Sequence, residues 1–126
     1  MTELMAGFAV QPEGARLAYR EQPGDLPVCI GAVFRIVDPA TGKTVQQGAV
    51  GELEVKTPNR MRGYLDDEAA TTAAITADGY FRTGDLGWIR ADGAVVFESR
   101  VDDAMRVGAI WSVPPKSRRF CIRIRP

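Results

Sequence analysis

Glycines and prolines interrupt the chain so often that only short elements can form between them. The 126 residues include 13 glycines and 8 prolines. Residues 32–37 (AVFRIV) are a β-branched and aromatic run that ends at a turn signal, residues 38–42 (DPATG). Residues 51–57 (GELEVKT) alternate Leu53 and Val55 with charged side chains, which is typical of a strand with one solvent-facing side. The pattern therefore predicts short antiparallel strands.

The second half of the chain is expected to hold a helix and a hairpin. Acidic residues before an alanine-rich segment favour one short helix over about residues 67–76. Residues 79–83 and 86–90 are predicted strands. Residues 91–93 (ADG) are a tight turn before a returning strand over residues 94–98, since Asp-Gly between apolar runs indicates a hairpin. We therefore predict a mainly β fold with one short helix (α+β), arranged as a small, distorted antiparallel β-barrel.

The composition excludes several classes of protein. With 45% hydrophobic and 25% charged residues the chain is too apolar to be disordered, and it has no apolar run approaching the ~18 residues of a membrane-spanning helix. Because the sequence has no histidine, it cannot form a Ser-His-Asp triad or a histidine metal site by itself. The first residues do not resemble a secretion signal, so we expect a cytoplasmic protein, in which Cys29 and Cys121 could pair or stay free.

The formal net charge of zero combines two unequal parts. Residues 116–126 carry five basic and no acidic side chains, so residues 1–115 have a net charge of −5. A basic tail can bind nucleic acid or a membrane surface. Here, apolar residues at positions 120, 122 and 124 alternate with Cys121, Arg123 and Arg125, as in an edge strand. No recognised docking fold accompanies them. We therefore predict no nucleic-acid partner.

Three motifs follow one another between residues 51 and 108. They are Gly51-Glu52-Leu53-x-Val55 with Gly63-Tyr64-Leu65, then Tyr80-Phe81-Arg82-Thr83-Gly84-Asp85-Leu86-Gly87, then Ser99-Arg100-Val101-Asp102-Asp103-x-x-Arg106-Val107-Gly108. In order and spacing they resemble the adenylate-forming (AMP-binding) superfamily of acyl-CoA synthetases, luciferases and peptide-synthetase adenylation domains. Met1-Thr2-Glu3 is similar to the end of the family's Tyr-Gly-x-Thr-Glu motif.

The resemblance implies a division of the chain into three parts. Residues 1–101 would be the C-terminal β-rich subdomain of the large AMP-binding domain, and residues 102–108 the hinge and the start of the small domain. Residues 109–126 depart from the family pattern and form an atypical basic tail, so we hypothesise a shift of reading frame near residue 109. The sequence of residues 61–67 is most similar to that of fatty-acyl and related small-acid CoA ligases.

The resemblance also implies roles for five residues. Members of the family activate a carboxylic acid with ATP and Mg²⁺, form an acyl-adenylate, and pass the acyl group to CoA. Asp85 would accept hydrogen bonds from both ribose hydroxyls, as acidic residues do in dinucleotide sites, and Arg100 would also contact the ribose. Thr2 would bind the α-phosphate and Glu3 the Mg²⁺. Asp102 would be the hinge residue. The alternative is that Thr-Gly-Asp is simply a bulge or turn, and that Arg100 is a solvated charge.

The family's phosphate-binding loop and catalytic lysine have no counterpart in this sequence. Because a transition state needs its donors assembled together, we predict a partial acyl-CoA synthetase that is inactive alone, and we assign no catalytic residue. The alternative is a free-standing β-rich binding or oligomerisation module without catalysis. A complementary enzyme fragment or a second copy of the chain would be its protein partner.

Overall fold

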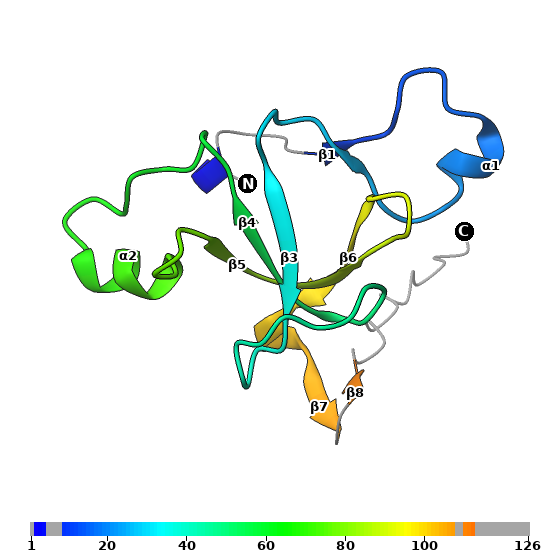
Figure 1. Ribbon diagram of the computed structural model, residues 1–126. Coiled ribbons are helices and arrows are strands. Elements are labelled where there is room, and N and C mark those ends of the chain that lie inside the picture. Colours follow the sequence, from blue (N-terminus) through cyan, green and yellow to red (C-terminus); the bar gives the residue numbers. More distant parts are fainter. Residues whose placement is uncertain (1, 5–8, 108–109, 113–126) are drawn as a thin grey trace, which may run out of the picture.

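A four-stranded antiparallel sheet forms the centre of the computed structural model, which describes residues 2–4, 9–107 and 110–112 (Figure 1). Its strands follow one another in the order β3 (Val33–Val37), β4 (Gly51–Lys56), β5 (Phe81–Ile89) and β6 (Val95–Arg100). The five predicted strand segments overlap these four strands. The segments 79–83 and 86–90, predicted as two strands, are one continuous strand with a bulge in its middle.

Helices are few and short, so the prediction of a mainly β fold is confirmed. The predicted helix is α2 (Glu68–Ala74), and the carboxylate of Asp67 caps it by accepting a hydrogen bond from the N–H of Ala70 at 2.8 Å. The structure adds a four-residue helix, α1 (Leu17–Arg20), which the sequence pattern did not indicate. Two 3-10 turns are η1 (Thr2–Leu4) and η2 (Val101–Asp103).

Two small strand pairs flank the central sheet. Strand β1 (Ala9–Val10) pairs with β2 (Leu26–Pro27), and β7 (Met105–Val107) pairs with β8 (Ile110–Ser112). The predicted boundary between the hinge segment and the basic tail falls between the strands of this last hairpin. Residues 113–126, which hold most of the tail, lie outside the described residues. The described strands form an open central sheet, and the closed barrel stays a prediction.

The hydrophobic core lies on one face of the central sheet. Its buried members come from η1 and from all four strands: Leu4, Ile36, Leu53, Val55, Phe81 and Val95. Burying an aliphatic or aromatic side chain of this size contributes about 1.5–3 kcal/mol to folding. Leu4 therefore anchors the N-terminal turn on the sheet, and the N–H of Met61 secures it further by donating to the Glu3 carbonyl at 2.8 Å.

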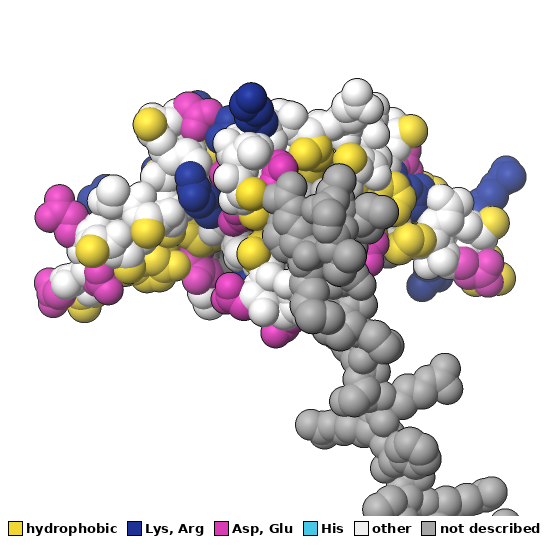
Figure 2. Space-filling view, turned by 90° about the horizontal axis from the view of Figure 1, so that it is seen from below, with side chains coloured by type: hydrophobic (Ala, Val, Ile, Leu, Met, Phe, Trp, Pro, Cys, Tyr) yellow, Lys and Arg dark blue, Asp and Glu magenta, His cyan; other side chains and the backbone are white. Residues whose placement is uncertain are grey.

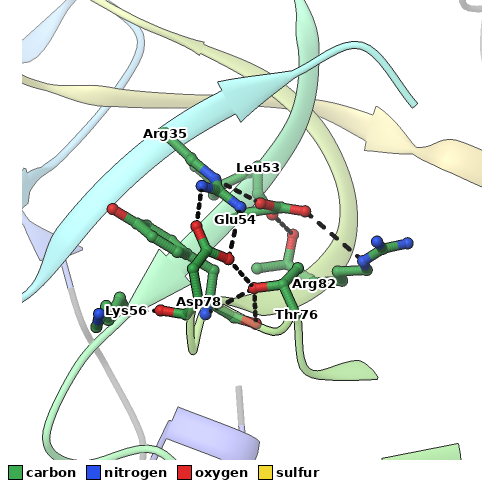
Figure 3. A network of polar contacts seen from close by, with 9 residues as sticks. Arg35, Leu53, Glu54, Lys56, Thr76, Asp78 and Arg82 are labelled. Carbon is green, nitrogen blue, oxygen red and sulfur yellow. Dashed lines mark hydrogen bonds and ion pairs between the residues drawn. The ribbon is translucent and has the colours of Figure 1, made fainter. Parts of the chain in front are cut away.

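The opposite face of the sheet carries a network of charged side chains (Figure 3). The Glu54 carboxylate accepts from Arg35 Nε at 2.6 Å and lies 3.7 Å from Arg82 Nε. Arg35 also pairs with Asp78 at 2.5 Å, and its guanidinium stacks 3.8 Å above the Tyr80 ring. The prediction that the charged side of β4 faces solvent is thus wrong at Glu54. This residue is only 3% exposed because side chains from both neighbouring strands cover it.

Candidate functional site

The Thr83-Gly84-Asp85 motif forms a bulge in the middle of β5. Glu52 of β4 pairs with Leu86, and Glu54 pairs with Arg82, so the three motif residues lie opposite Leu53 alone. Gly84 has a φ of +67°, a left-handed conformation that glycine adopts without strain. The motif is therefore a bulge, and the bulge places the Asp85 carboxylate beside β6.

An ion pair joins Asp85 to the next strand. Arg100 of β6 is the register partner of Asp85, and its Nη1 donates to Asp85 Oδ1 at 2.6 Å and to the Thr83 carbonyl at 3.0 Å. The Asp85 side chain is 14% exposed and that of Arg100 is 52% exposed. The structure therefore brings together two predicted site residues as a fixed carboxylate beside an accessible guanidinium, a group with five N–H donors.

A second carboxylate, Glu52, lies on the β4 side of the bulge. Burial raises its pKa, and the negative charges of Glu54 and Asp85 raise it further, while a hydrogen bond from the Gly84 backbone lowers it. The sequence analysis assigned no role to Glu52. Its signal was present in the Gly-Glu-Leu motif, but only the bulge shows that this side chain reaches the backbone of Gly84.

The N-terminal turn holds the other two predicted ligand-binding residues. Thr2 is exposed, and its hydroxyl donates to Glu3 Oε2 at 3.1 Å. A backbone hydrogen bond within Glu3 lowers the pKa of its carboxyl, against the effect of burial, and the positive charge of Arg100 lowers it further. Glu3 is thus within electrostatic reach of Arg100, although the two residues are almost a hundred positions apart in sequence.

A magnesium ion could use Glu3 as a ligand only if other groups completed its coordination. In the described part of the chain, no group of three or more Asp, Glu, Cys or His side chains could hold a metal. One charged carboxylate suits Mg²⁺ when water and nucleotide phosphates supply the other ligands. Glu3 therefore fits a Mg²⁺ ion that is held together with a nucleotide.

The predicted hinge residue, Asp102, is exposed in η2, directly after β6. It lies two positions beyond Arg100, so the chain leaves the candidate site through this turn. Its hinge role stays a prediction. Of the two cysteines, Cys29 lies 3.1 Å from the hydroxyl of Thr57, and Cys121 is outside the described residues.

One hollow of the surface, of about 710 Å³, is lined by residues 62–68 and Thr71 and contains none of the predicted site residues. Within residues 2–4, 9–107 and 110–112, no helix has the length and apolar character needed to cross a membrane.

Comparison with known proteins identifies CoA ligases among the relatives of this chain. No protein-family model matches the sequence. The chain is 37% identical over 92 residues to 4-coumarate–CoA ligase-like 6 of Oryza sativa subsp. japonica, and 31% identical over 116 residues to 4-coumarate-CoA ligase 2 of Narcissus pseudonarcissus. These matches cover 73% and 91% of this chain but only 15% and 20% of the two relatives. The chain thus spans about a fifth or less of their length.

Solved structures share the fold over most of the chain. The ATP-bound RpMatB-BxBclM chimera B3 superposes with a TM-score of 0.75 at 33% identity, and it covers 90% of this chain and 22% of its own. The O-succinylbenzoate coenzyme A synthetase MenE from Bacillus subtilis, in complex with AMP, gives a TM-score of 0.74 at 26% identity, with coverages of 90% and 23%. Both neighbours were solved with an adenine nucleotide.

Proposed function

Because the chain belongs to the adenylate-forming superfamily, we propose that it supplies the ribose-binding part of the ATP site of an AMP-forming acyl-CoA synthetase. One observation carries the proposal. The Asp85 carboxylate is held in place by the bulge and by Arg100 at 2.6 Å, in a strand pair open enough to leave half of the Arg100 side chain exposed.

The chemistry of the pair suits a ribose. Two vicinal hydroxyls can donate to one carboxylate, and a carboxylate that is already oriented binds them at a lower entropic cost. Arg100 has donors beyond the one that Asp85 uses, so it can also hold a hydroxyl oxygen. In this proposal, the nucleotide lies across the bulge of β5 and the end of β6, and Asp102 begins the hinge.

The N-terminal turn would serve the phosphates of the same nucleotide. The Thr2 hydroxyl would donate to an α-phosphate oxygen, and Glu3 would hold Mg²⁺ together with the phosphates. Magnesium would neutralise charge as the carboxylic acid attacks the α-phosphorus and pyrophosphate leaves. The thiol of CoA would then displace AMP from the acyl-adenylate, forming the thioester. Support for this part is that Thr2 and Glu3 lie together in η1, which Leu4 anchors on the central sheet.

Titration with AMP tests the proposal directly. We expect backbone amide shifts at β5 and β6 in the ¹⁵N-labelled chain, with a Kd in the ~mM range because a ribose contact is a small share of a nucleotide site. Asp85→Asn should weaken binding about tenfold or more, by removing a charge-assisted acceptor. Asp92→Asn is the matched control, since Asp92 forms an ion pair of the same length with Arg90. Unchanged affinity in the Asp85 variant would overturn the proposal.

Exposed apolar side chains favour a second candidate, the free-standing binding or oligomerisation module. Ile30 is 93% exposed, and Val28 and Val33 are each about half exposed in the same stretch of chain. The face seen in Figure 2 carries apolar groups alongside acidic and basic side chains. Sedimentation velocity separates the two candidates: a dimer that Ile30→Lys dissociates would support the module, and a monomer would count against it.

A further inference from the structure

The Thr83 hydroxyl stands at the centre of the bulge. The side chain belongs to a residue that is 5% exposed, and its Oγ1 donates to the Leu53 carbonyl at 2.7 Å. The same oxygen accepts a hydrogen bond from the Asp85 N–H at 3.0 Å. One hydroxyl therefore connects β4 to the backbone of the residue that carries the candidate ribose-binding carboxylate.

The bulge explains why a hydroxyl is needed at this position. Three residues of β5 lie opposite Leu53, so the regular alternation of ladder hydrogen bonds cannot continue through them. A buried carbonyl or N–H without a partner is costly, and a hydroxyl can donate to one while accepting from the other. Thr83 does both, whereas an apolar side chain of the same shape could do neither.

Arg100 secures the bulge from the other side. Its Nη1 reaches the Thr83 carbonyl at 3.0 Å as well as the Asp85 carboxylate. A Cβ added to Gly84 would lie 3.0 Å from Arg100 Nη2, so the guanidinium packs closely over the glycine. The position of Asp85 is thus set by β4 through Thr83 and by β6 through Arg100.

We propose that Thr83 is a positioning residue that fixes the Asp85 carboxylate by closing the β5 bulge onto Leu53. Thr83 acts through the backbone of Asp85 and does not touch the nucleotide. Its effect on nucleotide affinity rests on the proposed function. Its effect on the bulge does not, so the two can be tested separately.

Thr83→Val removes the hydroxyl while keeping the shape of the side chain, and Thr83→Ser keeps the hydroxyl. Thr71→Val is the matched control. The Thr71 hydroxyl also bridges a backbone donor and acceptor, Tyr64 N–H and the Asp67 carbonyl, both at 2.8 Å. Two readouts apply to the full chain: hydrogen exchange of the Asp85 amide, relative to the core amide of Val55, and AMP affinity by NMR titration.

In Thr83→Val we expect the Asp85 amide to exchange about tenfold faster relative to Val55, the effect of losing one hydrogen bond. We expect AMP affinity to fall about tenfold. Thr83→Ser should restore both within about threefold, and Thr71→Val should change neither. Unchanged relative exchange in Thr83→Val would overturn the role of Thr83 in closing the bulge.

The remaining outcomes separate a failure of the proposed function from a failure of the role proposed for Thr83. Faster exchange with unchanged AMP affinity, in a chain that binds AMP, would show that Thr83 is structural only and would overturn the positioning role. If the wild-type chain does not bind AMP at all, the proposed function fails, and the exchange measurement still decides whether Thr83 closes the bulge.

Discussion

At the scale of single residues, two carboxylates near the charged face of the sheet should respond to pH in opposite directions. The hydrogen bond from Arg35 lowers the pKa of Asp78 to about 2, with help from the Thr76 hydroxyl. Burial and neighbouring negative charges raise the pKa of Glu52. The first carboxylate is therefore stabilising when ionised, and the second is stabilising when protonated.

We predict that Asp78→Asn and Glu52→Gln shift the pH profile of stability with opposite signs. The folded-state pKa of Asp78 lies below its unfolded value, so its contribution is complete above about pH 4 and disappears as the pH falls towards 2. Asp78→Asn should therefore unfold at lower urea than the wild type at pH 6, with the difference shrinking near pH 2.

Glu52→Gln should do the reverse. The contribution of Glu52 is present below its unfolded pKa and is lost as the pH rises through its raised folded pKa. The Gln variant should therefore gain stability relative to the wild type between pH 4 and 7. Urea unfolding midpoints measured at intervals from pH 2 to 7 check both variants, and parallel profiles would contradict the assigned causes.

At the scale of elements, local sequence signals and tertiary contacts contribute differently to α2 and the β-hairpin. The helix begins at an acidic cap that is visible in the sequence, and its first turn is closed by Asp67. The β5–β6 hairpin also has a visible turn, Asp92-Gly93. Its bulges are not visible, because each depends on which residues of two strands face one another.

We predict that Asp67→Ala lowers the free energy of unfolding by about 1 kcal/mol, the usual value of a helix cap. The lost contact is the 2.8 Å hydrogen bond from Ala70 N–H. Asp66→Gly is the control in the same loop. Asp66 has a φ of +54°, so glycine there relieves strain and should leave stability unchanged or raised. Chemical denaturation of both variants checks the comparison.

Two glycines of the β5–β6 hairpin should tolerate alanine very differently. A Cβ on Gly87 would overlap the Val96 carbonyl across the strands, whereas a Cβ on Gly93 would meet only open space. Gly93→Ala should cost about 1 kcal/mol, from its φ of +87° alone, and Gly87→Ala about 3 kcal/mol or more. Equal midpoints in urea would show that β6 can move away from Gly87, where β5 and β6 pair irregularly, at little cost.

At the scale of the whole molecule, the fold corresponds to about a fifth of the solved structures that it resembles. The matches cover 90% of this chain and 22–23% of the neighbouring structures. The described site offers a carboxylate, a guanidinium and an N-terminal turn. In the superfamily that the motifs resemble, the donors that stabilise the reacting phosphate come from the phosphate loop and the catalytic lysine.

We predict that the 126-residue polypeptide alone gives only background carboxylate-dependent ATP–pyrophosphate exchange, because those donors must act together with Asp85 in one transition state. A panel of fatty and aromatic acids, with an intact acyl-CoA synthetase as the positive control, makes the measurement. Exchange above background that Asp85→Asn abolishes would show that these residues suffice.

The sequence by itself determined the superfamily, the strand and turn pattern, and the short helix, because these depend on residues that are neighbours in the chain. It also led to Asp85 and Arg100 through the motifs that contain them. Only the tertiary structure decided that the two form an ion pair, that Glu54 is buried, and that the Thr83 hydroxyl links Leu53 to Asp85. Each of these contacts depends on strand register. Packing between segments that are distant in sequence sets the register, and a shift of one residue would change every contact.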